Sequence, residues 1–511
     1  MSVSTVLSAA LQGLSVAEVH VEADVSNGLP VFHMVGYLSS EVKEASERVR
    51  TAIRNSGITI PAKKIVVNLA PANVRKRGAS FDLPSALSIL ASMGVVNHEK
   101  LENIMVVGEL GLDGHVKKVA GILPIVMRAK ELGCKTCILP EENAKEGALV
   151  EDIAILGVQN LQEVCQILNG EYQKEATKRE NGLAFTKEEI ERLDFADIQG
   201  QRAVKRATEV AVAGGHNLLF VGPPGSGKSM IAKRIPSILP KPSMEESMQI
   251  TQIYSVLGMV DEEKPLITGR PFRNVHHAVT RAALIGGGRI PIPGEISLAH
   301  EGVLFLDELA EFQKPVLEVL RQPLEEHQIR IIRNHGSYVF PANFILVAAM
   351  NPCPCGNYPD LTKCTCTPTQ IQQYLGRISQ PFLDRIDICI EAPRIDYESL
   401  VSKEKQETSE EIRERVCKVR GIQRKRFEGT KILTNSMLDV KELDYYCPLG
   451  QEEEKIMKHA FQTMNLTART YHKVLKVART IADMDGKEQI EAVHLKEALG
   501  YRTLDRKYWG R

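Results

Sequence analysis

Residues 222–229 constrain the fold of this chain most, because they read GPPGSGKS and match the phosphate-binding P-loop pattern at every fixed position. The apolar stretch 217–221 precedes them and MIAKRI follows, which is the strand, loop and helix context that the motif requires. Backbone N–H groups of such a loop turn onto phosphate oxygens. We therefore expect ATP to be bound by Gly222, Pro223, Pro224, Gly225, Ser226, Gly227, Lys228 and Ser229.

A second motif supplies acidic groups for magnesium and for catalysis. Residues 302–308 read GVLFLDE, which predicts a buried parallel strand that ends at Asp307 and Glu308. Asp307 and the Ser229 hydroxyl are expected to hold Mg²⁺, while Lys228 reaches the β- and γ-phosphates. Glu308 is expected to activate the attacking water as general base. By itself the pattern also fits an acidic loop after a core strand, but the P-loop upstream favours the catalytic interpretation.

Three further polar residues follow in the order that an ATPase of this kind would need. Asn351 ends the apolar stretch NFILVAAMNP, where it could hydrogen-bond the γ-phosphate and the lytic water. Arg385 in PFLDRID could face the nucleotide of a neighbouring subunit and stabilise transition-state charge in trans. Arg469 in LTART begins a predicted lid helix, where it could contact the γ-phosphate. An isolated helical arginine is usually solvated, so only the ordered series supports these two roles.

Residue patterns divide the chain into four parts. A mixed α/β unit is expected over residues 1–170, a polar linker over 171–190, a parallel α/β core over 191–395 and an almost wholly helical region over 396–511. Within the first part, Asn27-Gly28 predicts a hairpin, and residues 39–57 predict one amphipathic helix.

Composition limits which binding partners and which cellular compartment we expect. The 64 Lys and Arg residues balance 64 Asp and Glu residues, so any contact with DNA must come from local basic patches. The N-terminal stretch lacks the pattern of a signal peptide, and no run approaches the roughly 20 apolar residues of a membrane span. The ten cysteines do not form the dense framework of a small secreted domain. We expect a cytoplasmic protein with no membrane partner.

Several long stretches carry a family resemblance: GPPGSGKS, PFRNVHHAVTRAALIGGG, PIPGEISLAHEGVLFLDELAEF, NPCPCGNY and QPFLDRID. The whole chain resembles magnesium-chelatase-like AAA+ ATPases of the ComM/YifB type. The resemblance implies an α/β fold with a Lon-protease-like α+β domain, a P-loop AAA+ core and an all-α C-terminal lid. It implies ATP and Mg as cofactors and a homo-hexameric ring. The implied activity is that of a DNA helicase in branch migration during homologous recombination, notably natural transformation, with single-stranded, forked or branched DNA as partner.

The same resemblance assigns the residues already singled out. It gives the P-loop, acidic, sensor and arginine roles to Lys228, Ser229, Asp307, Glu308, Asn351, Arg385 and Arg469. One segment departs from the commoner form of its motif, so His276, His277 and Arg281 either face DNA or brace the insertion before the acidic pair.

The N-terminal domain resembles the Lon protease domain without its base. KRGASFDLPSAL places Ser80 at the nucleophile position, but the position of the lysine base is occupied by Leu123. A serine hydroxyl without a nearby amine is a weak nucleophile at neutral pH. We expect an inactive scaffold or a DNA-binding module, with VRKR at 74–77 as a basic loop suited to phosphates.

Four cysteines gather after the sensor asparagine, at Cys353, Cys355, Cys364 and Cys366. Four thiolates can complete a tetrahedral zinc shell, although C-x-C is a less typical spacing than C-x-x-C. A structural Zn ion is one interpretation, and a redox or merely packed cluster is the other. Cys134 and Cys137, beside an apolar strand, are expected to pack in the core.

Three functions remain open on the sequence alone. The leading hypothesis is a DNA-dependent motor. The second is an ATPase subunit of a magnesium-chelatase-like metal-insertion or protein-remodelling complex, although the Lon-like domain and the four-cysteine loop are additions to such subunits. The third is a binding module that ATP merely switches, against which the intact Asp307-Glu308 pair argues, because Glu308 serves turnover rather than binding.

Overall fold

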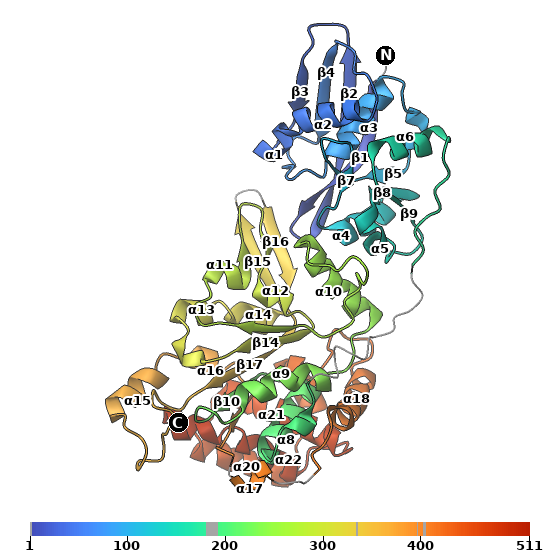
Figure 1. Cartoon of the computed structure of the whole chain (residues 1–511). Helices are drawn as coiled ribbons and strands as arrows, with labels where there is room; N and C mark the ends of the chain where they lie inside the picture. Colours follow the sequence, from blue (N-terminus) through green and yellow to red (C-terminus); the bar gives the residue numbers. More distant parts are fainter. Residues whose placement is uncertain (1–2, 180–192, 334–335, 396, 402–404, 511) are drawn as a thin grey trace.

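The computed structural model describes residues 3–179, 193–333, 336–395, 397–401 and 405–510. Its N-terminal part is built on a seven-stranded mixed sheet in the order β3-β4-β2-β1-β5-β8-β9 (Figure 1). The strands are β1 (Ser4–Gln12), β2 (Ser15–Ser26), β3 (Phe32–Val35), β4 (Lys64–Ala70), β5 (Ile104–Val106), β8 (Thr136–Pro140) and β9 (Ala154–Val158). A small ribbon, β6 (Glu109–Leu110) with β7 (Val116–Lys117), lies outside this sheet.

Six helices accompany this sheet. They are α1 (Ser40–Lys43), α2 (Ala45–Asn55), α3 (Asp82–Ser92), α4 (Ile122–Glu131), α5 (Ala144–Gly147) and α6 (Leu161–Asn169). Helix α3 is buried on nearly every face against β1 and β2, because its residues are almost all apolar or small. The region therefore has an apolar core of its own.

One local prediction for this region was wrong, and another was confirmed only in part. The stretch after Asn27-Gly28 does not close a hairpin, because β2 and β3 each pair with β4, one antiparallel and one parallel. Tertiary pairing with a distant strand thus overrides the local turn signal. The helix expected over 39–57 is interrupted at Glu44, whose ψ of −15° tightens the turn between α1 and α2.

The central part contains a five-stranded, wholly parallel sheet in the order β11-β14-β17-β10-β18. Its strands are β10 (Leu218–Val221), β11 (Phe272–Val275), β14 (Gly302–Leu306), β17 (Phe344–Met350) and β18 (Ile388–Glu391). Every residue of β10, β14 and β17 is buried, as expected for parallel strands covered on both faces.

Helices and two hairpins complete the central part. The helices are α8 (Arg202–Gly214), α9 (Lys228–Ile238), α10 (Met244–Val256), α11 (Arg281–Ile285), α12 (Glu295–Leu298), α13 (Lys314–Glu318), α14 (Arg321–Glu326), α15 (Pro368–Leu375) and α16 (Gln380–Leu383). The hairpins are β12 (Gly286–Gly287) with β13 (Ile292–Pro293), and β15 (Gln328–Arg333) with β16 (Gly336–Pro341).

The C-terminal part is helical, as predicted. It comprises α17 (Tyr397–Val401), α18 (Ser409–Arg426), α19 (Val440–Tyr446), α20 (Gln451–Thr463), α21 (Ala468–Met484), α22 (Ala492–Gly500) and α23 (Thr503–Trp509). Helices α18 and α21 pack on α8, whereas α23 returns to strand β18. Residues 180–190 of the expected linker, and the expected boundary residues 191 and 396, lie outside the described residues.

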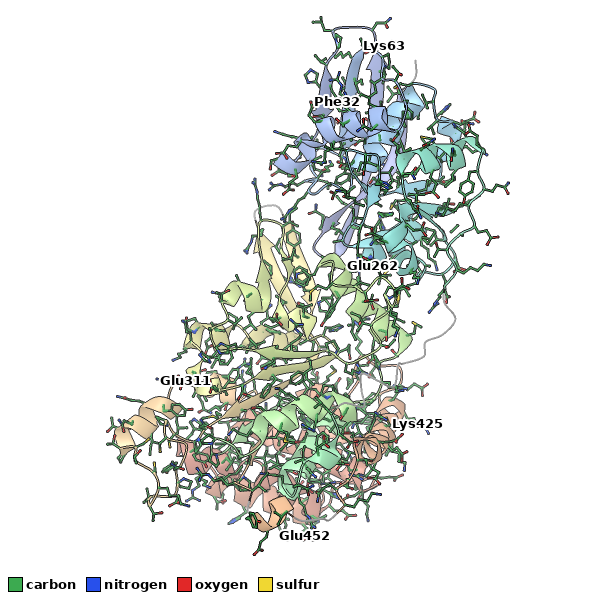
Figure 2. All side chains as sticks on the ribbon, viewed as in Figure 1. Phe32, Lys63, Glu262, Glu311, Lys425 and Glu452 are labelled. Carbon is green, nitrogen blue, oxygen red and sulfur yellow. The ribbon has the colours of Figure 1, made fainter. Side chains whose placement is uncertain are left out.

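The N-terminal part contacts the central part through helix α10. The N–H of Gly121 donates to the carbonyl of Ser255 over 2.8 Å, and Lys118 forms an ion pair with Glu262. Figure 2 shows Glu262 at this junction. No helix in the described ranges combines the length and the apolar character needed to cross a membrane.

Candidate functional site

The P-loop connects β10 to α9 at the carboxyl edge of the central sheet, where parallel α/β sheets bind their ligands. Gly225 and Gly227 have φ values of 77° and 82°, which favour glycine, and an added Cβ at either would meet open space. At Gly222 a Cβ would instead collide with the carbonyl oxygen of Ala392. The loop is therefore packed on its inner side and open on its outer side, as a cradle for phosphate must be.

The ammonium group of Lys228 lies inside this loop. It donates to the carbonyl oxygens of Gly222 and Pro223, both at 2.8 Å, and lies 3.3 Å from Oδ1 of Asn351. Lys228 is only 8% exposed, and burial lowers the pKa of its amine to about 8, while the charge of Asp307 opposes that shift. The amine is thus preorganised for an anionic ligand.

Ser229 and Asp307 come together from α9 and from the end of β14. The hydroxyl of Ser229 donates to Oδ2 of Asp307 over 2.6 Å. The other carboxylate oxygen accepts the N–H of Glu308 at 2.9 Å. A hydroxyl and a carboxylate are the hard oxygen donors that Mg²⁺ prefers, and the open loop beside them fits the phosphates of ATP. The residues present therefore fit both expected cofactors.

Glu308 leaves the strand in the left-handed region, with φ 54° and ψ 48°. Its side chain is 59% exposed, and its Oε2 lies 3.3 Å from Nδ1 of His277. The ring of His277 lies beside that of His276, with centroids 4.1 Å apart. His277 therefore contacts the expected general base, a link that sequence spacing could not reveal. Arg281 is exposed at the start of α11.

Asn351 reaches the P-loop because β17 and β10 are neighbours in the sheet. The two strands pair in parallel from Leu218–Val347 to Val221–Met350, and the N–H of Gly222 donates to the carbonyl of Met350. Both strands consequently deliver their next residues to the same edge. The structure thus brings together Lys228, Ser229, Asp307, Glu308 and Asn351 as the sequence predicted.

One residue at this site was missed by the sequence analysis. Gln201 lies in the left-handed region just before α8, and its side-chain amide donates to the carbonyls of Ser226 at 3.2 Å and Pro393 at 2.8 Å. It ties the P-loop to the segment that leaves β18. Its only local signal was the glycine at position 200, which also has a positive φ.

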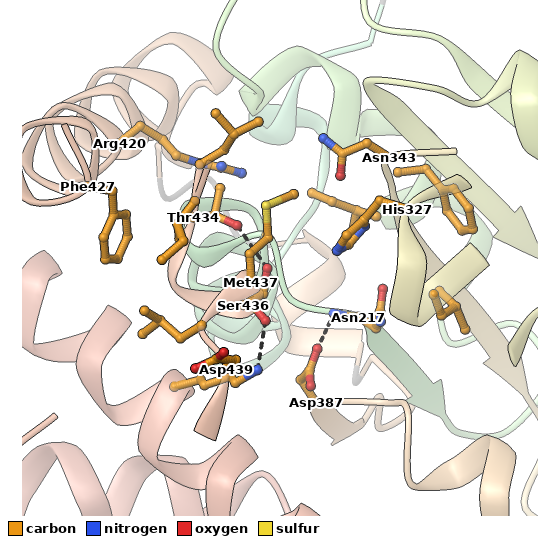
Figure 3. Close-up of a pocket in the computed structure, with 18 of the residues that line it drawn as sticks. Asn217, His327, Asn343, Asp387, Arg420, Phe427, Thr434, Ser436, Met437 and Asp439 are labelled. Carbon is orange, nitrogen blue, oxygen red and sulfur yellow. Dashed lines mark hydrogen bonds between the residues drawn. The ribbon is translucent and has the colours of Figure 1, made fainter. Parts of the chain in front are cut away.

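Arg385 and Arg469 lie away from this chain's P-loop. Both line a pocket of 1010 Å³. Its wall includes Asn217, Asn343 and Asp387, the residues that immediately precede β10, β17 and β18 (Figure 3). None of residues 222–229 lines it. At a rise of about 3.3 Å per residue, the length of β10 separates the two edges by roughly 15 Å. The lid arginine thus lies beside Arg385, at the sheet edge opposite the P-loop.

Arg385 is held within its own chain at this pocket. Its guanidinium donates to Oε1 of Glu325 over 2.6 Å, and also to the carbonyl of Pro381. Desolvation by burial lowers the pKa of Arg385, against the attraction of Glu325. The adjoining segment is fixed as well, because Asn217 donates to the carbonyl of Arg385.

The four cysteines of the loop after Asn351 converge, with their sulfur atoms all within 4.8 Å of one another. The pair Cys134 and Cys137 differs from them. Both of these are buried in an apolar cluster of the N-terminal part, and burial raises the pKa of each thiol.

In the N-terminal part, the surroundings of Leu123 do not favour proteolytic catalysis. Leu123, in the first turn of α4, is 0% exposed in the apolar core, and its N–H donates to the carboxylate of Glu146. In the expected basic loop 74–77, Lys76 is fully buried and donates to the carbonyl of Pro71. Only Arg77 of the three cations is exposed. Tertiary packing therefore removes Lys76 from the cations that the loop could present to phosphates, while Arg77 stays exposed.

The central sheet has five parallel strands in the order β11-β14-β17-β10-β18, and the P-loop follows β10. An acidic pair follows β14 and an asparagine follows β17. This combination defines an AAA+ ATPase. Comparisons with known proteins give the family. The chain belongs to the magnesium chelatase family, because models of that family match three successive parts of it, and the model "Magnesium chelatase, subunit ChlI" matches residues 194–400. The models "Subunit ChlI of Mg-chelatase" and "Magnesium chelatase, subunit ChlI C-terminal" match residues 21–143 and 406–502.

Relatives that match nearly the whole chain show which type within the family it resembles. The chain is 44% identical to "Competence protein ComM" of Haemophilus influenzae over 512 residues, which cover 99% of this chain and 98% of that protein. It is 41% identical to "Uncharacterized protein YifB" of Escherichia coli, with the same coverage. A magnesium-chelatase 67 kDa subunit of Chlorobaculum parvum is 29% identical over 164 residues, 31% of this chain and 23% of that protein. The chain is thus a magnesium-chelatase-like AAA+ ATPase of the ComM/YifB type, which confirms the resemblance and the fold class.

Proposed function

We propose that this protein is an ATP-driven DNA motor, a helicase that promotes branch migration in homologous recombination and natural transformation. The name of the Haemophilus relative supports a role in competence, since the two chains match over nearly their whole lengths. Chromosomal and incoming DNA are handled in the bacterial cytoplasm, so we place the protein there.

The observation that carries the DNA proposal is a pair of adjacent basic hairpins. The hairpins at residues 286–293 and 328–341 contain three arginines and no acidic residue, although the whole chain is neutral. The two hairpins meet where Nε of Arg333 donates to the carbonyl of Gly288. Arg289 and Arg330 are exposed on them. Such a patch is suited to DNA phosphates, which contribute most of the non-specific affinity of DNA-binding proteins.

An apolar side chain lies within the same patch. Ile332 is 71% exposed on β15, one residue beyond the buried Ile331. On the partner strand, Val339 is exposed opposite Arg330, while Tyr338 and Phe340 face the core. The strand alternation therefore gives the hairpin an inner face that anchors it and an outer face with apolar and cationic groups. Such a face can contact both the bases and the backbone of an unpaired strand.

The assembly proposal is supported by the separation of Arg385 from the P-loop of its own chain. An arginine at the opposite sheet edge can complete the ATP site of a neighbouring subunit, so two subunits build each site. Arg469 lines the same pocket and is proposed to accompany it. Repetition of this head-to-tail contact closes a ring, for which we propose the homo-hexamer.

In the proposed site, Lys228 holds the phosphates, while Ser229 and Asp307 hold Mg²⁺, which would supply charge neutralisation when bound. Glu308 accepts a proton from the attacking water, and Asn351 orients that water. His277 lies 3.3 Å from the Glu308 carboxylate and is proposed to position it.

The decisive experiment measures ATP turnover of the full chain with no DNA and with single-stranded, duplex and forked DNA. We expect stimulation by DNA, and loss of that stimulation and of DNA affinity in Arg289→Glu and Arg330→Glu. Arg128→Glu is the matched control, because Arg128 is a surface arginine of α4 paired with Glu131. A wild type that neither binds DNA nor responds to it would refute the proposal.

A second function is favoured by the family models and by the partial match to the magnesium-chelatase subunit. In that alternative, the ATPase drives metal insertion or remodels a protein partner. It predicts turnover that is insensitive to every DNA form and unaffected by the two hairpin substitutions.

A further inference from the structure

The loop between β17 and α15 brings two distant pairs of thiols together. The sulfur of Cys353 lies 3.4 Å from that of Cys355 and 3.8 Å from that of Cys364. The sulfurs of Cys355 and Cys364 are 3.6 Å apart. Cys366 completes the group, in which all four sulfurs lie within 4.8 Å of one another.

These separations are those of a tetrahedral metal shell. With zinc–sulfur bonds of about 2.3 Å, the edges of a regular tetrahedron of sulfurs measure about 3.8 Å. A disulfide would require a separation of about 2.05 Å, and all four cysteines are free. The cluster is therefore too open for disulfides and has the spacing that four ligands to one ion adopt.

The backbone around the cluster supplies the outer hydrogen bonds of such a site. The N–H of Cys355 donates to the sulfur of Cys366, and the N–H of Tyr358 donates to the sulfur of Cys353, both at 3.4 Å. Donors of this kind stabilise thiolate ligands and fix their direction. Four soft sulfur ligands with no oxygen or nitrogen ligand select zinc among the common structural ions.

The loop is packed directly on the ATP site. Gly356 has φ 79°, and an added Cβ there would collide with the ring of Pro224, an exposed residue of the P-loop. On its other side, Asn357 accepts a hydrogen bond from Arg394, just beyond β18. The ring of Tyr358 lies edge-on to that of Tyr508 in α23. The loop thus bridges the P-loop, the exit of the sheet and the last helix.

We propose that Cys353, Cys355, Cys364 and Cys366 bind one zinc ion, and that the zinc-held loop supports the P-loop at Pro224. Without the ion, a loop of short turns has no apolar core to hold Gly356 in place, because three of its four cysteines are only partly buried. The P-loop then loses its outer support and binds ATP more weakly. This inference rests on the proposed ATP site but not on DNA binding.

The first test is the metal content of the full-length protein, purified without added zinc, by inductively coupled plasma mass spectrometry. We expect one zinc per chain in the wild type and in Cys417→Ser, a control at an exposed cysteine of α18. Zinc is expected to fall at least about tenfold in Cys364→Ser, since loss of one thiolate removes a ligand bond. A wild type without metal, or with iron in its place, would overturn the zinc assignment.

The second test separates support of the P-loop from general unfolding. Wild-type protein is treated with a zinc-selective chelator in excess Mg²⁺, and its affinity for a fluorescent ATP analogue is measured before and after zinc is restored. We expect Kd to rise about tenfold, equivalent to about 1.4 kcal/mol, and to recover on restoration. Gly356→Ala should retain zinc but weaken ATP binding. Unchanged ATP affinity in both experiments would overturn the supporting role, whether or not DNA stimulates turnover.

Discussion

The guanidinium of Arg385 donates to the carboxylate of Glu325 over 2.6 Å, and both residues belong to one chain. Arg385 is 7% exposed, so this pairing offsets the desolvation of its charge. To act on a neighbour's nucleotide, the guanidinium must exchange Glu325 for phosphate oxygens. On the proposed role in trans, the pair would hold the arginine until a neighbouring subunit presents its nucleotide.

Mixed rings test this exchange between subunits. Arg385→Ala should lower ATP turnover by on the order of 10³ to 10⁵, as loss of an arginine finger does. A mixture of Arg385→Ala and Lys228→Ala chains should recover part of the activity, because one kind of mixed interface keeps both groups. Steady-state ATP hydrolysis over a series of mixing ratios measures the recovery.

The matched control mixes Lys228→Ala with Glu308→Gln. Both lesions lie on the P-loop side of the interface, so every site in such a mixture is defective and no recovery is expected. Equal recovery in the two mixtures, or none in the first, would contradict action in trans.

Lys228 and Glu308 should separate nucleotide binding from turnover. Lys228→Ala removes the amine that lies among the P-loop carbonyls, so ATP binding should fall below detection. Glu308→Gln keeps the fold of the loop and should bind ATP with near wild-type affinity but hydrolyse it at least about 100-fold more slowly. Equilibrium binding and single-turnover hydrolysis give the two quantities. Lys233→Ala, at an exposed lysine of the same helix, is the control.

The lowered pKa of Lys228, about 8 against an ordinary 10.5, predicts proton uptake on ATP binding at alkaline pH. Near pH 9 the free amine is mostly neutral, and the phosphates of ATP raise its pKa, so the bound amine regains a proton. Below pH 7 the amine is charged in both states and no uptake is expected. Calorimetry in two buffers of different ionisation enthalpy measures the uptake. Lys228→Arg should abolish it, because arginine stays charged.

The lowered pKa of Lys228 also determines how the free energy of unfolding of the nucleotide-free protein changes with pH. Between pH 8 and 10.5 the unfolded lysine binds more protons than the folded one, so this group makes the free energy of unfolding rise with pH. At pH 8 and below, the cost of burying the charged amine is fully present. Denaturant unfolding of the wild type and of Lys228→Met should therefore converge as pH increases through this window.

Ser80→Ala should leave ATP hydrolysis and the response to DNA unchanged. It should also leave the free energy of unfolding unchanged within about 0.5 kcal/mol. The resemblance to the Lon protease domain places Leu123 where that domain has its base, and Leu123 is enclosed in the apolar core. Peptide-cleavage assays on the wild type and on the variant provide the check. Cleavage by the wild type that disappears in Ser80→Ala would show that another group supplies the base.

The sequence alone determined the nucleotide edge of the sheet. The P-loop, the acidic pair and Asn351 are each the residues that follow an apolar strand, and parallel strands deliver their carboxyl ends to a common edge. Their convergence around Lys228 therefore followed from order along the chain. The helical C-terminal region could also be predicted from the spacing of its apolar residues.

Relationships between distant segments were decided by the tertiary structure. Local turn chemistry predicted a hairpin at Asn27-Gly28, but β2 and β3 both pair with β4, which places the partly buried Phe32 and Met34 of β3 against the apolar core. Charge in the sequence predicted a phosphate-binding loop at 74–77, yet packing buries Lys76. A one-dimensional pattern does not contain the packing partner of a residue, and burial depends on that partner.

The placement of the two arginines shows the same division. Their residue type and order along the chain predicted a catalytic role for Arg385 and Arg469. Arg385 lies at the edge where the strands begin because it precedes β18 by three residues, whereas Arg469 lines the same pocket because its helix α21 packs on α8. Arg385 is paired with Glu325 there. Order along the chain determined which functional groups are available, and long-range packing decided at which edge of the sheet those groups lie. The two edges are distinct places because the full length of the strands separates them.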